Sequence, residues 1–244
     1  MKNILITICA RGGSKGIPGK NVKVINGKPL IGYTIDCAKK FREAVTANYS
    51  VDIELSTDSE QIRKVAAECG LDSEYVRPDY LASDTAGKVD AIYDVFSYSE
   101  KKNGKQYDYI LDLDCTSPLR TQKDLTEALA VLESDPEALI IYSVSEPARN
   151  PYFNMVEQQP NGYYDVVKKL DSQYLSRQTA PKVYDLNASF YIYTRKLFEL
   201  GYRTTDTDHS LIYLMDHLCF DLDNPIDFEF MTFLLENHKL DFEI

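Results

Sequence analysis

The sequence lacks apolar runs long enough to cross a membrane, and its histidines and cysteines are few and scattered. No hydrophobic stretch approaches the roughly 18 residues of a spanning helix, so neither a transmembrane segment nor a membrane partner is expected. The three histidines form no cluster of ligands, and the five cysteines lie 28 or more residues apart. That spacing is neither a disulfide framework nor a zinc pattern, so we expect reduced, mostly buried thiols in a cytoplasmic protein.

Positive charge is also scarce outside the first 35 residues. With 27 basic and 38 acidic side chains, the formal net charge is −11. This balance argues against nucleic acid as a partner, because binding to a phosphate backbone requires a broad basic face. Residues 1–35 nevertheless carry six basic side chains and no acidic one. A single basic segment on an acidic protein suits a small anion instead.

The basic segment contains a glycine-rich loop directly after an apolar run, Ile4–Cys9, that is expected to be a strand. The loop reads RGGSKGIPGKN, and its cations are Arg11, Lys15 and Lys20. Glycine lets backbone N–H groups approach phosphate oxygens, while the cations neutralise their charge. The spacing matches neither a Walker A loop nor a dinucleotide fingerprint. The loop therefore predicts a polyphosphate site, most simply for a nucleoside triphosphate.

Strand and helix patterns alternate along the rest of the chain. This order predicts one α/β domain spanning residues 1–244, with a mostly parallel sheet covered by helices on both faces. Ligands bind at the carboxyl ends of the strands in such sheets. After the first strand, the expected strands are 51–57, 107–114, 138–144, 188–193, 211–215 and 217–222, and the expected helices are 30–41, 62–69, 88–102, 125–132, 195–200 and 225–237.

The pattern changes between residues 146 and 186. Prolines interrupt it, Asn161-Gly162 is a hairpin signal, and aromatic side chains gather there. We interpret this segment as a β-rich excursion outside the main sheet. Exposed aromatic residues on such an arm would form a surface for a second copy of the chain, giving a homodimer. An ordinary insertion packed on its own domain is the alternative.

The opening ARGGSKGIPGKN resembles that of the CMP-sialic acid synthetases, the acylneuraminate cytidylyltransferases. RPDYLASDT, TSPLRT and FDLD follow in the order and spacing of that family. The segments ARNPYFNMVE, RQTAPKVYDLNASFYIY and LDLDCTSPLR are most similar to synthetases that activate legionaminic acid. The resemblance implies a Rossmann-like, nucleotide-diphospho-sugar transferase-like fold with a small dimerisation excursion. It also implies a reaction in which CTP and a nine-carbon sugar acid give a CMP-sugar and diphosphate.

The resemblance further implies roles for residues at matching positions. Asp221 and Asp223 would coordinate Mg²⁺ or Mn²⁺; two carboxylates two residues apart on a strand face the same side and can share a hard cation. Lys15, Lys20 and Asp223 would act in the reaction itself. The nucleotide would be bound by Arg11, Gly12, Gly13, Ser14, Lys15, Lys20, Asn21, Arg77, Ala82 and Ser83. The sugar and the second subunit would contact Asp114, Thr116, Ser117, Tyr152, Phe153, Arg177 and Tyr191.

One departure from the family pattern concerns the sugar. Sialic acid synthetases read Q-P-T-S-P-L-R where this chain has Asp114-Cys115 before Thr116. Asp114 could accept hydrogen bonds from the substrate or contact a second cation, or it could cap the following turn. Local structural roles are expected for Asp112 and for Asp58, which we interpret as a helix cap. The mismatch favours a legionaminate-like sugar over N-acetylneuraminate.

Three classes of function remain open on the sequence. The favoured one is a CTP-dependent synthetase of a CMP-activated nonulosonic acid. The others are a sugar-1-phosphate nucleotidylyltransferase that uses another base and a nucleotide-binding module without catalysis. The presence of Lys15, Lys20, Asp221 and Asp223 argues against the module, because binding alone requires neither metal nor leaving-group contacts.

Overall fold

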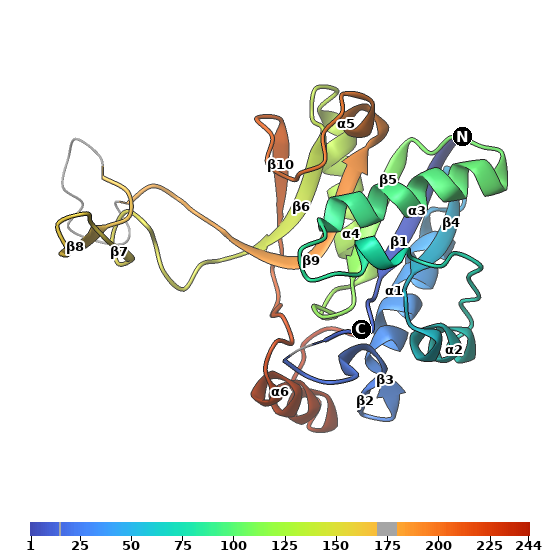
Figure 1. Cartoon of the computed structure of the whole chain (residues 1–244), viewed down its shortest axis with the longest axis horizontal. Helices are drawn as coiled ribbons and strands as arrows, with labels where there is room; N and C mark the ends of the chain where they lie inside the picture. The colour runs from blue at the N-terminus through green and yellow to red at the C-terminus, as the bar shows by residue number, and fades with distance from the viewer. Residues whose placement is uncertain (15, 170–179) are drawn as a thin grey trace.

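The centre of the fold is a six-stranded sheet that is parallel except for one strand. The computed structural model describes residues 1–14, 16–169 and 180–244 (Figure 1). The sheet is formed by β1 (Lys2–Cys9), β4 (Tyr49–Ser56), β5 (Tyr109–Asp114), β6 (Ile140–Ser145), β9 (Asp185–Thr194) and β10 (Ser210–Leu214). Its order is β10-β6-β9-β5-β1-β4, and β9 runs antiparallel to both of its neighbours. The expectation of a mostly parallel sheet is confirmed.

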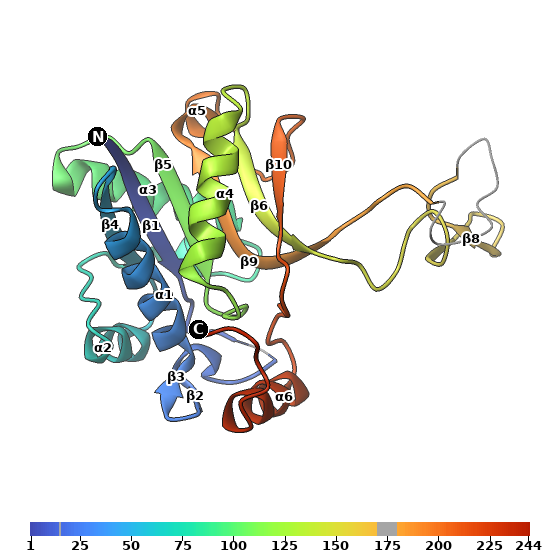
Figure 2. The same ribbon diagram turned by 180° about the vertical axis from the view of Figure 1, so that it is seen from behind.

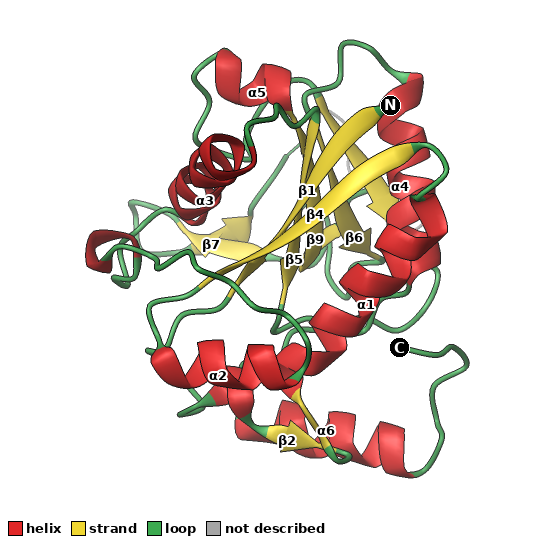
Figure 3. Ribbon diagram, turned by 90° about the vertical axis from the view of Figure 1, so that its right-hand side faces the viewer, coloured by secondary structure: helices red, strands yellow, loops and turns green. Residues whose placement is uncertain are grey.

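Helices cover both faces of this sheet, as the alternating pattern predicts. They are α1 (Leu30–Val45), α2 (Glu60–Glu68), α3 (Lys88–Asn103), α4 (Gln122–Ser134), α5 (Arg195–Glu199) and α6 (Pro225–Glu236), with 3-10 turns η1 (Lys20–Val22) and η2 (Asp79–Leu81). Helices α1 and α4 lie on one face and α3 and α5 on the other, as Figure 2 and Figure 3 show. Helix α6 lies beyond the carboxyl ends of the strands.

The two faces of the sheet have separate hydrophobic cores. On β1, Ile4, Ile6 and Ile8 pack in the cluster that contains α1 and α4. Leu5 packs in the other cluster, with side chains of α3 and α5. Successive side chains of a strand point to opposite faces, so a strand that is apolar throughout must be covered on both sides. This is why the apolar run before the glycine-rich loop forms an interior strand.

A short hairpin anchors the segment that follows the loop. It consists of β2 (Val24–Ile25) and β3 (Lys28–Pro29), joined by Asn26 and Gly27 with φ of 47° and 78°. Positive φ at both central residues is what a two-residue type I′ turn requires. Ile25 packs in a third cluster with side chains of α6. The hairpin therefore attaches the N-terminal loop to the C-terminal helix.

The excursion forms an arm that stands away from the body of the molecule (Figure 1 and Figure 2). Strands β7 (Val156–Gln158) and β8 (Tyr164–Val166) pair antiparallel as a separate sheet. The expected hairpin at Asn161-Gly162 is confirmed, and Gly162 has the positive φ, 83°, that the turn requires. Within the described residues, no helix is long and apolar enough to cross a membrane.

One expected strand does not form. Residues 217–222 contain the apolar side chains of Leu218, Cys219, Phe220 and Leu222, but the structure assigns no strand there. The segment runs past the end of the sheet, where the Leu222 N–H donates a hydrogen bond to the Thr116 carbonyl oxygen (2.8 Å). Its apolar side chains Phe220 and Leu222 pack in the cluster that contains side chains of α6 instead of extending a ladder.

A buried arginine fixes the turn between β5 and α4. Arg120 is 0 % exposed, and its Nη1 donates to the carbonyl oxygens of Asp114 (2.9 Å) and Ser117 (2.8 Å). The same nitrogen also contacts the Ser189 carbonyl oxygen on β9 (2.9 Å), and Nη2 donates to Oγ1 of Thr34 on α1 (2.9 Å). One guanidinium thus joins two strands, a turn and a helix.

We expect Arg120→Met to lower the free energy of unfolding by about 3 kcal/mol, because several buried carbonyl oxygens would lose their donor. Urea denaturation followed by circular dichroism measures this change. Arg42→Met, at an exposed position of α1, is the control and should change stability by less than about 0.5 kcal/mol. Equal stability of the two variants would contradict the role assigned to Arg120.

Candidate active site

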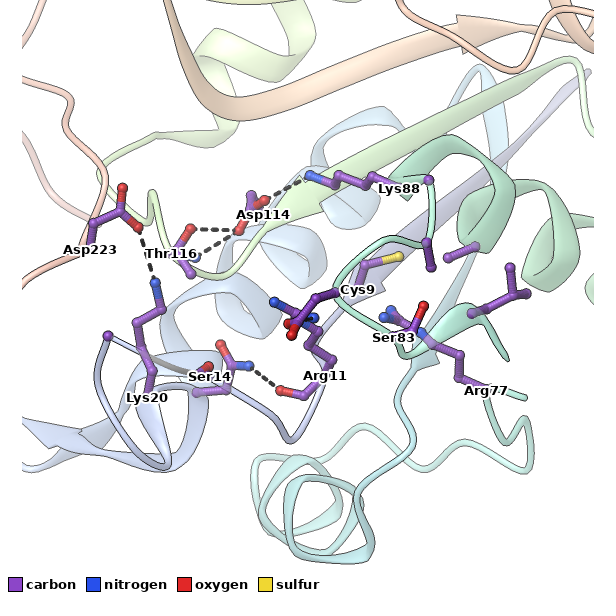
Figure 4. A pocket seen from close by; sticks show the side chains of 17 residues that line it. Cys9, Arg11, Ser14, Lys20, Arg77, Ser83, Lys88, Asp114, Thr116 and Asp223 are labelled. Carbon is purple, nitrogen blue, oxygen red and sulfur yellow. Dashed lines mark hydrogen bonds and ion pairs between the residues drawn. The ribbon is translucent and has the colours of Figure 1, made fainter. Parts of the chain in front are cut away.

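A cleft of about 440 Å³ opens where β1 and β5 end (Figure 4). Its walls come from the loop after β1, the RPDYLASDT segment with the start of α3, the turn after β5, and the residues before α6. This is the edge of the sheet at which ligands bind in α/β proteins. The predicted site residues that line the cleft are Arg11, Ser14, Lys20, Asn21, Arg77, Ser83, Asp114, Thr116 and Asp223.

The glycine-rich loop is in direct contact with the segment that contains the aspartate pair. The Lys20 ammonium donates a hydrogen bond to the Leu222 carbonyl oxygen (2.7 Å) and lies 3.4 Å from Oδ1 of Asp223. At Gly16, a Cβ atom would come within 2.6 Å of the Asp223 carbonyl oxygen, so glycine permits this approach. A basic loop and an acidic pair from opposite ends of the chain therefore form one site.

The loop is held by hydrogen bonds at its flanks. The Asn21 side-chain amide donates to the Arg11 carbonyl oxygen (3.1 Å), and Nη1 of Arg11 pairs with Oδ1 of Asp84 (2.8 Å). The Gly12 N–H donates to Oδ1 of Asp58 (2.8 Å). These contacts fix the backbone and leave the Arg11 guanidinium on the wall of the cleft.

Asp58 does not cap α2, and the expectation from the sequence is wrong. The cap is Ser59, whose hydroxyl accepts a hydrogen bond from the Ile62 N–H (3.4 Å). Either residue type can cap a helix, so the sequence could not distinguish the two neighbours. Asp58 instead orders the basic loop through its bond to Gly12.

The far wall of the cleft carries Arg77, which is only 6 % exposed. Its Nε donates to Oγ of Ser56 (2.9 Å) and its Nη2 to the Ser56 carbonyl oxygen (2.8 Å), at the last residue of β4. Because both bonds are made to the end of a strand, the guanidinium is held in one orientation. Ser83 lies on the same wall, whereas Ala82, which follows η2, does not line the cleft.

Asp114, at the end of β5, caps the turn that follows it. Its Oδ1 accepts hydrogen bonds from the N–H and the hydroxyl of Thr116, both 2.9 Å, and its Oδ2 lies 2.7 Å from the Lys88 ammonium. Burial acts to raise the pKa of Asp114, but the Lys88 charge and the Thr116 donors outweigh it and lower the pKa to about 2. The turn-cap role is confirmed, and a contact with the sugar stays a prediction.

Lys88 bridges two carboxylates of β5. Besides Asp114, its ammonium lies 2.9 Å from Oδ2 of Asp112, which is fully buried. The other oxygen of Asp112 accepts a hydrogen bond from the Thr7 hydroxyl (2.8 Å). Burial acts to lower the pKa of Lys88, but the two carboxylates raise it above its usual value. The expected local structural role of Asp112 is confirmed by these contacts.

Asp221 and Asp223 do not lie on a strand, so the argument that they face the same side of one is wrong. Asp223 is exposed and lines the cleft, while Asp221 is partly buried beneath it. Oδ1 of Asp221 is buried and has no hydrogen-bond partner among the described residues. Burial raises the pKa of Asp221, and the nearby carboxylates of Asp114 and Asp223 raise it further. An unpartnered carboxylate oxygen beside two other carboxylates fits a divalent cation.

Other predicted residues surround the cleft without lining it. Gly12 and Gly13 belong to the backbone of the loop. Ser117 is fully buried, and its hydroxyl donates to the Phe220 carbonyl oxygen (3.3 Å), which fastens the turn after β5 to the segment before α6. Tyr191, on β9, is partly buried, and its ring centroid lies 5.2 Å from the Lys88 ammonium.

The remaining predicted residues are not brought to this cleft. Tyr152 and Phe153 belong to the arm, where the Lys168 ammonium lies 5.4 Å from the centroid of the Tyr152 ring. Within one chain, they are therefore not part of the cleft walls. Lys15 and Arg177 lie outside the described residues.

Among the lining residues that the sequence analysis missed, those with an ionisable side chain are Cys9, Asp84 and Lys88. Lys88 had a usable signal, because it is the only lysine between residues 64 and 101 and stands just after RPDYLASDT. Cys9 had none beyond its place at the end of a strand. Burial raises the pKa of its thiol to about 12, so it is neutral at physiological pH.

A group of possible metal ligands outside the cleft was also not expected. Asp124, Asp216 and His217 place one ligand atom each within 4.8 Å of one another. Nε2 of His217 is 3.0 Å from Oδ2 of Asp124, and that oxygen also accepts from the Thr121 N–H (2.6 Å) at the start of α4. These contacts give His217 a structural role in holding the segment before α6 against α4.

The chain is similar over nearly its whole length to curated proteins of one family. The Cytidylyltransferase family matches residues 5–241. Post-translational flagellin modification protein B of Campylobacter coli is 37% identical, with 98% of each chain covered. CMP-N,N′-diacetyllegionaminic acid synthases of Campylobacter jejuni and Legionella pneumophila are 36% and 30% identical, covering 98% and 96% of each chain respectively.

Two solved structures share the fold. CMP:2-keto-3-deoxy-manno-octonic acid synthetase in complex with CTP aligns with a TM-score of 0.68 at 16% identity and covers 98% of this chain and 100% of its own. 4-Diphosphocytidyl-2C-methyl-D-erythritol synthase of Anaerococcus prevotii aligns with a TM-score of 0.64 at 14% identity and covers 96% of both chains. The family match spans the strands, loops and helices that build the cleft. The chain therefore belongs to the cytidylyltransferase family and is a nucleotidyltransferase with CTP as its substrate.

Proposed function

We propose that this enzyme transfers CMP from CTP to a nonulosonic acid of the legionaminic type and releases diphosphate. The observation that carries the proposal is the meeting of Lys20 with Leu222 and Asp223 in one cleft, which joins a triphosphate loop to an acidic pair. The sugar is inferred from relatives named CMP-N,N′-diacetyllegionaminic acid synthase that align end to end.

The nucleotide is proposed to lie along the loop after β1. Arg11, Lys15 and Lys20 would neutralise the triphosphate, with backbone N–H groups of Gly12, Gly13 and Ser14 close by. Oδ1 of Asn21 is buried without a hydrogen-bond partner among the described residues, so it can accept a hydrogen bond from the nucleotide. Arg77, Ala82 and Ser83 would then enclose the base and ribose.

Asp221 and Asp223 would hold Mg²⁺ or Mn²⁺ between the protein and the phosphates. The fit rests on the unpartnered Oδ1 of Asp221 and on the exposed carboxylate of Asp223. Divalent hard cations prefer carboxylate and phosphate oxygens as ligands. When bound, the ion would supply charge neutralisation at the phosphates and favour ionisation of the attacking hydroxyl.

The protein's own contribution to the reaction is positioning and electrostatics. The anomeric hydroxyl oxygen of the sugar acid attacks the α-phosphorus of CTP in line, and the bond to the β-phosphate oxygen breaks. Lys20 is anchored on Leu222 and faces the departing diphosphate, whose new negative charge it would stabilise. Thr116, Ser117, Asp114 and Tyr191 would border the sugar.

We also propose that residues 146–186 form a dimerisation arm. Val156, Tyr163 and Tyr164 are 63%, 76% and 67% exposed, although such side chains normally gain stability by burial. The arm stands clear of the body that carries the cleft (Figure 1), so a second copy is the natural cover for it. Tyr152, Phe153 and Arg177 would then approach the sugar of the partner subunit.

The first test of this function measures diphosphate release with Mg²⁺, each of the four common ribonucleoside triphosphates, and a panel of acceptors. We expect release only with CTP and a nine-carbon acid, and fastest with a legionaminic acid. Preference for pseudaminic or N-acetylneuraminic acid would correct the sugar. Diphosphate release with a sugar phosphate would show that the chain is a sugar-1-phosphate nucleotidylyltransferase instead. No diphosphate release with any pair of substrates would indicate a nucleotide-binding module without catalysis.

Asp223→Asn should reduce kcat by at least about a hundredfold, because an amide cannot neutralise a cation as a carboxylate does. The exposed position means that the melting temperature should stay within about 2 °C of the wild type. Glu229→Gln, an exposed carboxylate on α6, is the matched control and should leave both quantities unchanged. Normal turnover of Asp223→Asn would remove this residue from the metal site.

The arm predicts a dimer whose formation depends on its apolar side chains. Light scattering after size-exclusion chromatography should give twice the mass of 27.8 kDa for the wild type. Replacing Val156, Tyr163 and Tyr164 with serine should shift the mass to that of one chain. Leu200→Ser, equally exposed but outside the arm, should leave the dimer intact. If the wild type is a monomer, the arm is not a dimerisation surface and is an ordinary insertion.

A further inference from the structure

Apolar side chains stay exposed on one face of the sheet, at the edge formed by β10. Leu211 and Tyr213 of this strand pack in the cluster that contains α1 and α4. Because successive side chains of a strand point to opposite faces, Ile212 and Leu214 point to the face of α3 and α5. Both are nevertheless 39% exposed. In Figure 1, where that face is towards the viewer, β10 lies to the side of both helices.

These side chains belong to a patch that extends over three strands. Directly paired residues of neighbouring strands place their side chains on the same face of a sheet. Two such rows cross β10, β6 and β9, namely Ile212–Tyr142–Tyr191 and Leu214–Val144–Leu186. Leu186 is 58% exposed, and the partly buried rings of Tyr142 and Tyr191 have centroids 6.1 Å apart. We call these six residues the sheet face.

The sheet face lies between the cleft and the root of the arm. The centroid of the Tyr191 ring is 5.2 Å from the ammonium of Lys88, which lines the cleft. In the other row, Val144 is followed at once by Ser145, where the chain leaves for the arm. Leu186 follows Asp185, where the chain returns. A protein segment bound on the sheet face would therefore also border the cleft.

The arm carries a second exposed apolar surface, formed by Val156, Tyr163 and Tyr164. It extends away from the body of its own chain, so these side chains cannot cover the sheet face of that chain (Figure 1 and Figure 2). Complete burial of the three side chains would supply roughly 500 Å². A stable interface buries about 800 Å² on each partner, so the arm requires a further apolar surface. The sheet face is such a surface on the same chain.

We propose that the sheet face binds the arm of a second copy of this chain. A two-fold axis repeats the contact, so each copy gives its arm to the other and both exposed apolar surfaces are buried twice. The hairpin of β7 and β8 from one copy then lies beside the cleft of the other, next to Tyr191. This inference rests on the dimer proposed above and assigns the surface of the body that receives the arm.

The first test removes apolar side chains from the sheet face. Ile212→Ser/Leu214→Ser should shift the mass measured by light scattering from that of a dimer to that of one chain. Both positions are exposed, so the melting temperature followed by circular dichroism should stay within about 2 °C of the wild type. Ile226→Ser/Phe233→Ser is the matched control: these residues of α6 are 65% and 50% exposed outside the sheet face, and the dimer should remain.

The second test mixes two defective chains. The arm variant, with serine at Val156, Tyr163 and Tyr164, keeps an intact sheet face, and the double serine variant of β10 keeps an intact arm. Neither can pair well with itself, but a mixed pair regains one of the two contacts. Analytical ultracentrifugation should therefore give a Kd for the mixed pair at least about tenfold below that of either variant with itself, which is the effect of one regained apolar contact.

Each other arrangement of the dimer gives a different result. If the β10 variant alone is a dimer, the arms pair with each other, and if the arm variant alone is a dimer, the sheet faces pair with each other. Either result overturns this inference, as does a mixed pair that is no tighter than its parents. If the β10 variant does not fold, Leu186→Ser replaces it in both tests.

These measurements use no substrate, so they are independent of the proposed reaction. A wild type that is a dimer but makes no CMP-sugar would overturn the proposed reaction and leave this inference to the mixing test. A monomeric wild type would overturn this inference together with the dimerisation arm, while diphosphate release would still decide the reaction.

Discussion

The bond from the Lys20 ammonium to the Leu222 carbonyl oxygen is the contact on which the cleft depends. It joins residues from opposite ends of the chain, and the close approach at Gly16 tightens the same junction. A main-chain carbonyl oxygen is neutral, so a lysine that donates to it keeps its positive charge. Lys20 can therefore bind an anion while it also holds the backbone at Leu222 in place. The hairpin of β2 and β3 packs on α6, which holds together the two segments that carry Lys20 and Leu222.

Charge in the cleft is arranged so that each half can hold a different kind of chemical group. The side proposed to hold the nucleotide carries Arg11, Lys20 and Arg77 as cations. On the other side, Lys88 lies between the carboxylates of Asp112 and Asp114, which offset its charge. The buried guanidinium of Arg120 holds the turn between these halves by bonding to carbonyl oxygens, which adds no mobile charge to the site.

Much of this arrangement could be predicted from the sequence, because apolar periodicity reports which faces are buried. Periodicity predicted the helices and the strands of the main sheet, whereas the meeting of the first loop with the late aspartates was predicted from the family resemblance. The failures have physical causes. The apolar side chains of 217–222 do not show whether a neighbouring strand is available for pairing. Asp58 and Ser59 are both good caps, and only the folded loop shows that Asp58 bonds to Gly12. The partners of Lys88 lie on another element, so its role is a product of the fold.

The reversed direction of β9 has a consequence for how such enzymes can diversify. Because β9 is antiparallel to β6, the chain leaves the sheet at Ser145 and returns at Asp185 as a directly paired position. An insertion between two paired positions can lengthen, shorten or change its surface without displacing any strand or the cleft. The surface carried by this segment can therefore change while the sheet and the walls of the cleft keep their positions.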